Sequence, residues 1–225
     1  MQSAAASRKL GRLDVSGGCA GLAYSSSSLP ISHKESKIIY IIVAAPQRQK
    51  HMQLETDRLV LRSFRAQDVD VMAQLFANPD FMRFSLGVFT ERKRTVEFIE
   101  KVMGWDHVGM PSQFAVAPRG HQALIGYCGF FHHPEVPGEV EIGYRLHPDY
   151  WNRGLITEAA RGVRDHGFAH LNLPRVISLI HPENLPSRRV AEKNDMNVEQ
   201  EITFRGFPTL VYVITREQWL ANRDA

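Results

Sequence analysis

The stretch HPDYWNRGLITEAARG, which spans His147–Gly162, joins a proline-containing aromatic loop to the start of a helical pattern. Gly154 is the only glycine at this junction, and the turn YWNRG holds no acidic residue. A helix N-terminus has unpaired N–H groups and about half a positive charge, so a short loop before it can hold an anion without a lysine. We therefore expect either an ordinary loop or a phosphate-binding loop, with the helix starting at Ile156 or Thr157.

The segments on either side of this loop predict a parallel crossover. Alternating polarity places Val140, Ile142, Tyr144 and Leu146 on one face of a strand, and Glu139, Glu141, Gly143 and Arg145 on the other. Small or apolar residues then recur at helical spacing over about four turns. The apolar run Val176–Ile180 is typical of a strand that is buried on both faces. A strand, a long helix and a second strand form a right-handed crossover, whose polar ends meet where open sheets bind ligands.

The remaining elements predict one α/β domain over residues 52–225. Before the crossover we expect a strand at Leu59–Arg62, helices capped by Asp68 and Thr90, and strands at Gln113–Ala117 and Leu124–Phe131. After it we expect a helix opened by Glu183 or Asn184, a hairpin of Asn197–Thr203 with Thr209–Thr215, and a tail helix capped by Thr215 and Gln218. The predicted sheet is mixed, mainly antiparallel and six- to seven-stranded, with flanking helices.

Residues 1–51 differ in composition from the rest of the chain. They contain nine serines, seven Lys or Arg and two Asp or Glu, whereas residues 52–225 carry twenty basic and twenty-two acidic side chains. We expect residues 1–51 to be a disordered N-terminal extension, produced by an upstream translation start or serving as an organelle transit peptide. The slight negative charge of residues 52–225 disfavours nucleic acid as a partner.

The cysteine and hydropathy patterns favour a cytoplasmic protein in a reducing compartment. Cys19 and Cys128 are too few for a disulfide framework or a thiolate zinc site. The longest apolar run, Ile38–Ala45, is less than half of a membrane span, so no membrane partner is expected. His132 and His133 have no third ligand at a suitable spacing, so we expect polar turn residues and no metal.

Three segments together resemble the GNAT N-acetyltransferase superfamily. EVEIGYRLHPDYWNRGLITEAARG resembles its strand, acyl-CoA loop and helix, HPENLPSRRVAEKNDM resembles the next strand–helix motif, and LETDRLVLRSFRAQDVD resembles the opening of its Rim-type branch of ribosomal-protein N-terminal acetyltransferases. The likeness runs from Met52 to Trp219. Two departures stand out, because Ile156 occupies a position that is usually small, and Asn194–Asp195 replaces the common Leu-Gly.

The resemblance implies a GNAT fold with a splayed parallel pair of strands and acetyl-CoA as the cosubstrate. It implies that the pyrophosphate lies on the backbone of Asn152, Arg153, Gly154, Leu155, Ile156 and Thr157. It places pantetheine along Tyr144, Arg145 and Leu146, and matches Asn184 and Ser187 to the second motif. The expected partners are acetyl-CoA and an amine acceptor, which is either a protein N-terminus or a small-molecule amine, and the protein is expected to be a monomer or a homodimer.

Acetyl transfer to an amine requires a base, a stabilised oxyanion and a proton for the departing thiolate. Glu141 is the candidate base, although an outward-facing carboxylate on a half-exposed strand is the alternative. A backbone N–H near Arg145 or Leu146 would hold the oxyanion. Ser187 would protonate the sulfur, unless Asn184 and Ser187 serve only as a helix cap.

Aromatic residues between the first two predicted helices are candidates for the acceptor pocket. Phe84 and Trp105 are the main ones, with Phe81 and Phe89 beside them, and a purely aromatic core is the competing interpretation. The leading hypothesis is an N-acetyltransferase that works by direct transfer. The alternative is a CoA-binding module with this fold and no turnover, suggested by Ile156 and by the lack of an unambiguous base.

Overall fold

The computed structural model describes residues 53–121 and 123–223. The expected disordered extension, residues 1–51, lies outside the described residues. Within the described ranges, we find no helix that combines the length and the apolar character needed to cross a bilayer.

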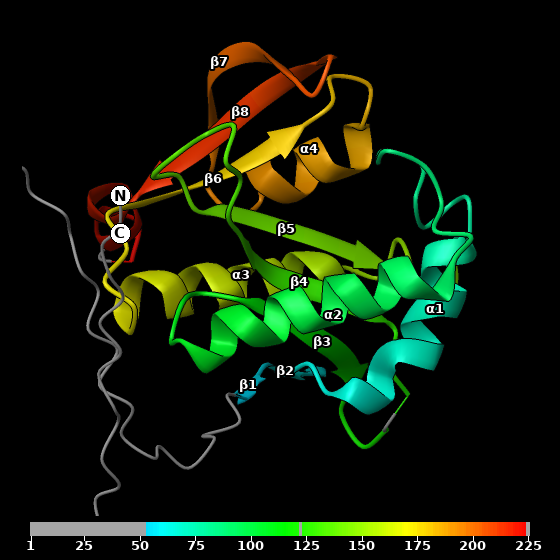
Figure 1. Ribbon diagram of the computed structural model, residues 1–225. Coiled ribbons are helices and arrows are strands. Elements are labelled where there is room, and N and C mark those ends of the chain that lie inside the picture. The colour runs from blue at the N-terminus through cyan, green and yellow to red at the C-terminus, as the bar shows by residue number, and fades with distance from the viewer. Residues whose placement is uncertain (1–52, 122, 224–225) are drawn as a thin grey trace, which may run out of the picture. The chain divides into compact units, whose positions relative to one another are not determined.

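Eight strands form one sheet in the order β1–β2–β3–β4–β5–β6–β8–β7 (Figure 1). Their bounds are Gln53–Glu55 (β1), Leu59–Ser63 (β2), Gln113–Pro118 (β3), Gly126–Phe131 (β4), Glu141–Leu146 (β5), Arg175–Ile180 (β6), Asn197–Phe204 (β7) and Phe207–Thr215 (β8). β5 and β6 are parallel, and every other neighbouring pair is antiparallel. The predicted mixed sheet is confirmed with one strand more than expected, because the three residues of β1 are too few to show a pattern and form a strand by pairing with β2.

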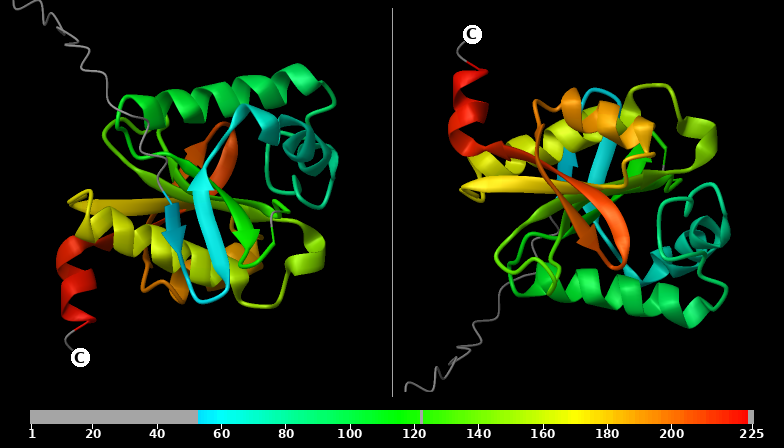
Figure 2. Two further views of the ribbon diagram at one scale, coloured as in Figure 1. Left: turned by 90° about the horizontal axis from the view of Figure 1, so that it is seen from below. Right: turned by 90° about the horizontal axis from the view of Figure 1, so that it is seen from above.

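Helices cover both faces of this sheet. Their bounds are Ala66–Asp68 (η1), Val69–Ala77 (α1), Arg92–His107 (α2), Pro148–Tyr150 (η2), Leu155–Ala169 (α3), Leu185–Glu192 (α4) and Arg216–Ala221 (α5). The two cores assign α1 and α2 to one face and α3 and α4 to the other, and Figure 2 shows α2 in green and α3 in yellow on opposite sides of the sheet.

Alternation along the strands builds a separate core on each face. On β3, Phe114 and Val116 belong to the main core under α3, whereas Ala115 belongs to the second core under α1 and α2. The main core also takes the helical-spaced residues Ala159, Ala160, Val163 and Phe168. Cys128 is fully buried in it, and burial raises the pKa of its thiol, so it packs as a small apolar residue, as the sequence predicts.

The starts of the first two α-helices differ from the prediction. α2 begins at Arg92 with Glu91 as its N-cap, so Thr90 does not cap it. Asp68 does precede α1, but its side chain makes no cap hydrogen bond. The carboxylate is buried and accepts two hydrogen bonds from the guanidinium of Arg62, at 2.7 and 2.8 Å. Its Oδ2 also accepts from the Arg65 N–H at 2.8 Å in the capping box of η1, so the carboxylate serves the preceding turn and not α1.

The later helix ends agree better with the sequence. α3 begins at Leu155, one residue earlier than expected, because Gly154 takes up a left-handed conformation and ends the loop. Asp195 has a φ of 61° after α4, the left-handed conformation in which Asp substitutes for Gly. Thr215 and Gln218 form the predicted capping box of α5.

β5 and β6 diverge beyond one paired position, Glu141 opposite Ile177 (Figure 1). Next to this pair, the Ile177 N–H donates to the Val140 carbonyl at 3.0 Å, and the Ser178 hydroxyl donates to the Ile142 carbonyl at 2.8 Å. From Tyr144 onward, the edge of β5 faces an opening instead of a neighbouring strand. The fold therefore places free backbone groups of β5 beside the loop that follows it.

Candidate functional site

The register between β4 and β5 decides which backbone groups face the split. The His147 N–H donates to the Ile125 carbonyl at 2.8 Å, and Arg145 lies opposite Tyr127 in the same register. Hydrogen-bonded pairs occur at every second residue of an antiparallel ladder, so the N–H of Arg145 is used by β4, and that of Leu146 points to the split. Of the two expected oxyanion donors, only Leu146 is therefore oriented correctly. Its carbonyl accepts from Trp151 Nε1 at 2.7 Å, which fastens the loop to the strand end.

The loop after β5 presents a helix N-terminus to solvent. Asn152 and Gly154 have φ values of 58° and 73°, and both residues are exposed. The left-handed residues end the loop directly before α3. As at any helix start, the N–H groups of its first turn, from Leu155 onward, have no intrahelical partners. The guanidinium of Arg153 lies over the Tyr150 ring, 5.5 Å from its centroid. The loop thus has the backbone donors that an anion site requires.

The turn between β1 and β2 supports this loop. Arg58 Nε donates to Glu158 in the first turn of α3 at 2.6 Å, and its Nη1 donates to the Arg153 carbonyl at 2.9 Å. Thr56 Oγ1 donates to the same carboxylate at 2.5 Å. Burial alone would raise the pKa of Glu158, but the hydrogen bonds from Thr56 and Arg58 outweigh it and lower that pKa. The ionised carboxylate of Glu158, which lies next to the loop of Gly154, is therefore balanced by the positive charge of Arg58.

On the α4 side of the sheet, Tyr144 and the start of α4 lie together. Asn184 is the N-cap, and its Oδ1 accepts from the Ser187 N–H at 3.3 Å. The Tyr144 hydroxyl donates to the Ser187 carbonyl at 3.1 Å, and burial raises its pKa above the ordinary value, so it stays protonated. The expected helix cap is present, and the two hydroxyl-bearing residues meet at the split.

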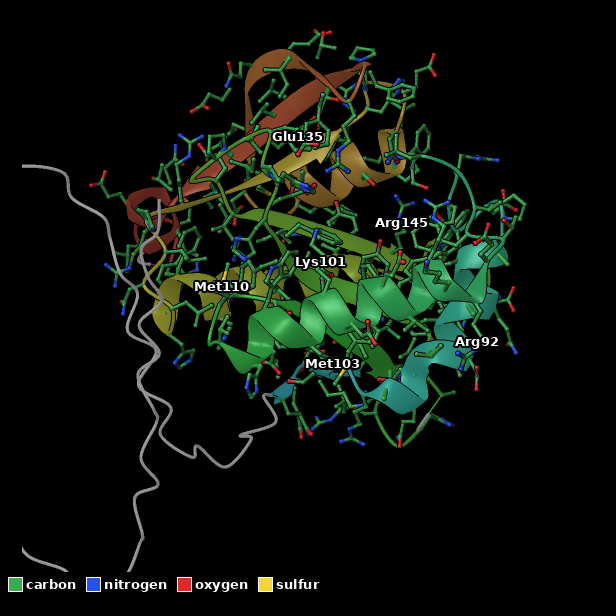
Figure 3. The ribbon with its side chains drawn as sticks, viewed as in Figure 1. Arg92, Lys101, Met103, Met110, Glu135 and Arg145 are labelled. Atoms are coloured by element: carbon green, nitrogen blue, oxygen red, sulfur yellow. The ribbon has the colours of Figure 1, made fainter. Side chains whose placement is uncertain are left out.

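On the opposite face, Glu141 and Arg145 line the split, as the predicted alternation requires. One oxygen of Glu141 accepts from the Leu179 N–H at 3.3 Å, and the other bonds to His133. Arg145 donates to the carbonyls of Phe81 and Phe84 at 2.8 and 3.3 Å, so it ties β5 to the loop between α1 and α2. Figure 3 shows Arg145 at the end of β5 nearest that loop.

The aromatic residues predicted for the acceptor pocket differ in where they lie on this face of the sheet. Phe84 is 38% exposed and stacks on His181 at 6.0 Å, so it connects the loop after α1 to the end of β6. The ring of Phe131 lies over Gly143, where a Cβ would come within 2.6 Å of it. Trp105 makes edge contacts with Phe131 and His132 at 6.5 and 5.1 Å. Phe81 and Phe89 belong to the second core, whereas Phe84, through its stack on His181, lies beside the widening split.

The comparison with known proteins agrees with this geometry. The family model of the acetyltransferase (GNAT) domain matches residues 58–197. The chain belongs to the GNAT acetyltransferase family. It is 32% identical over 177 residues to the uncharacterized N-acetyltransferase YnaD of Bacillus subtilis, covering 75% of this chain and 99% of that protein.

Solved structures extend the likeness to the fold of this GNAT chain. The crystal structure of a GNAT-family acetyltransferase from Bacillus anthracis is 31% identical, with a TM-score of 0.63, and the match covers 74% of this chain and 99% of that one. RimL, a ribosomal L7/L12 alpha-N-protein acetyltransferase solved with coenzyme A, is 17% identical with a TM-score of 0.64, covering 74% and 99%. At this identity, the likeness to RimL shows that the two chains share the fold.

The unusual Ile156 of this GNAT chain does not stand free over the loop. It is partly buried and packs against the main core beside Leu155, which is 8% exposed. Both side chains are therefore directed toward the core, away from the N–H groups at the start of the helix. This packing argues against an obstruction of the loop by the branched side chain.

Sequence reasoning missed four residues that the GNAT fold brings to the site: Thr56, Arg58, His133 and Arg205. Thr56 and Arg58 reach α3 across about one hundred positions of the chain. Arg58 lies within the quoted opening motif, but nothing local indicates its contact. His133 was assigned to a polar turn, and no three metal-ligating side chains gather in the described ranges.

Proposed function

We propose that this GNAT protein transfers an acetyl group from acetyl-CoA to a primary amine, directly within a ternary complex. The observation that carries the proposal is the split between β5 and β6, because the inward N–H of Leu146 lies between the loop of Gly154 and the carboxylate face of Glu141. A thioester that enters from the loop side and an amine that enters past Glu141 would meet at that N–H.

The groups on one side of the split support coenzyme A as the acyl donor. The N–H groups at the start of α3 and the loop backbone from Asn152 to Thr157 would bind the pyrophosphate, with the helix dipole adding to the attraction. The free edge of β5 at Tyr144 and Leu146 would pair with the pantetheine amides as a further strand would. Asn184, which caps α4, would hold the start of that helix beside the thiol.

The transfer step balances with the residues present at the split. Glu141 accepts a proton from the acceptor ammonium, whose pKa is about 10 for a lysine-type amine, and the neutral nitrogen attacks the thioester carbonyl. The Leu146 N–H stabilises the resulting oxyanion. The carbon–sulfur bond then breaks, the amide nitrogen loses its extra proton to water, and the thiolate takes a proton from the hydroxyl of Ser187, which is reprotonated from water.

An acceptor screen tests this function. The full chain is incubated with acetyl-CoA and a panel that contains peptides with free N-termini, a polyamine, an amino sugar and simple aliphatic amines, and released thiol is measured. We expect thiol release with at least one amine and none without an acceptor. Tight CoA binding by calorimetry, with no thiol release on the whole panel, would instead identify a CoA-binding module without turnover.

Arg58→Met should weaken CoA binding roughly 10-fold, because it leaves the Glu158 carboxylate uncompensated beside the pyrophosphate. Calorimetric titration with CoA measures the change. The matched control is Arg58→Met combined with Glu158→Gln, which removes both charges and should recover most of the affinity. Equal affinities for the wild type and the single variant would contradict this role of Arg58.

A further inference from the structure

The carboxylate of Glu141 is held at both oxygens. Oε1 accepts from the Leu179 N–H at 3.3 Å, and Oε2 bonds to Nε2 of His133. Both side chains are only 13% exposed. A carboxylate oxygen has a second lone pair, so each oxygen can still receive a proton from a substrate amine. The orientation of Glu141 therefore depends on one backbone donor and one histidine ring.

The second ring nitrogen of His133 reports which tautomer is present. Nδ1 lies 3.4 Å from Nη2 of Arg205, in the turn between β7 and β8. A guanidinium can only donate, so Nδ1 accepts, and the hydrogen of the neutral ring resides on Nε2, facing Glu141. Arg205 is itself held by Glu135 through hydrogen bonds of 2.8 and 3.3 Å. Figure 3 shows Glu135 on the loop between β4 and β5, in front of the last strands of the sheet.

The ring of His133 is also fixed in orientation. It stacks on Phe131 with a centroid distance of 5.7 Å and an interplanar angle of 26°, and Phe204 meets it edge-on at 5.2 Å. Phe131 is in turn packed over Gly143 of β5. Phe131 of β4 and Phe204 at the end of β7 thus set the ring orientation, and the adjacent Arg205 sets the tautomer.

We propose that His133 is a positioning residue: it orients Glu141, the base that takes a proton from the acceptor amine. Its Nε2–H holds the Glu141 carboxylate directed at the split, and Arg205 selects the tautomer that makes this possible. This inference rests on the proposed function, because it assigns Glu141 the role of base. His133 does not itself take the substrate proton, since its nitrogen toward Glu141 already carries a hydrogen.

Two amide substitutions separate positioning from a merely structural role. The amide nitrogen of a glutamine lies near the place of histidine Nε2, whereas that of an asparagine lies near Nδ1. We expect His133→Gln to retain kcat within about threefold, and His133→Asn to lose roughly 10- to 100-fold in kcat with unchanged CoA affinity, as misplacement of a catalytic group does. Equal kcat values for the two variants would overturn the proposal.

A second readout does not require turnover. Proton–nitrogen correlation spectra of the histidine rings in the full chain, in mildly alkaline buffer, identify the tautomer of His133, whose signals are assigned by their loss in His133→Gln. We expect the Nε2–H form in the wild type and a mixture of tautomers in Arg205→Leu. A predominant Nδ1–H form in the wild type would sink the proposal.

The kinetic and the spectroscopic experiments distinguish a failure of the proposed function from a failure of the positioning role. If no amine in the acceptor panel is acetylated, the proposed function fails, whereas the tautomer spectra still decide whether His133 and Arg205 hold Glu141 as described. If acetylation occurs and His133→Asn is as active as His133→Gln, the proposed function stands and the positioning role is wrong.

Discussion

Gly154→Asp is expected to weaken CoA binding by roughly 100-fold or more, which amounts to its loss at ordinary CoA concentrations. Gly154 has a φ of 73° and is the N-cap of α3, so its position lies at the centre of the N–H groups assigned to the pyrophosphate. A carboxylate at this position would repel the negatively charged pyrophosphate of CoA. Two like charges about 4 Å apart near a protein surface repel each other by on the order of 4 kcal/mol. A Cβ at this position would also lie 3.6 Å from Nη2 of Arg58, so the new carboxylate would compete for that cation.

The matched control is Gly154→Asn. Asparagine has the same shape as aspartate and tolerates the left-handed conformation, but it carries no charge. We expect the affinity for CoA to fall only a few-fold in Gly154→Asn and roughly 100-fold or more in Gly154→Asp. Calorimetric titration with CoA measures both affinities. If the two variants bind CoA equally well, charge at this loop is irrelevant and the assignment of the anion site is lost.

Glu141→Gln should have the largest effect on turnover. Removal of a general base typically lowers kcat by 10²- to 10⁴-fold, and the loss should be greatest at low pH, where a lysine-type amine is almost fully protonated. At high pH the neutral amine is already present, so the two rates should approach each other. CoA binding should not change, because Glu141 lies on the face opposite the start of α4.

The acceptor itself supplies a control for Glu141→Gln. An N-terminal amine, with a pKa near 8, needs less help from a base than a lysine-type amine with a pKa near 10. The variant should therefore lose less activity on the former at the same pH. A rate that falls by the same factor at every pH and for both amines would show that Glu141 supports the structure of the site without taking a proton.

Local patterns predicted the parts of the site that depend on one element. The two-residue period of Glu139–Leu146 correctly separated Glu141 and Arg145 from Tyr144 and Leu146, because successive side chains of a strand point to opposite faces. The helical spacing after Gly154 likewise predicted most residues of α3 that enter the core, although it missed Leu155 and the buried Arg164. Such periods are properties of the backbone, so they can be read without knowledge of the partner segments.

By itself, then, the sequence determined the order of most strands and helices, the crossover, the loop of Gly154 and the face that carries Glu141. Only the tertiary structure decided that Leu146 and not Arg145 turns its N–H to the split, that Ile156 packs inward, and that Arg58 and His133 hold the two carboxylates. The physical reason is that chain periodicity sets the direction of a side chain, whereas its partners come from distant segments that only the packed sheet brings within hydrogen-bonding distance.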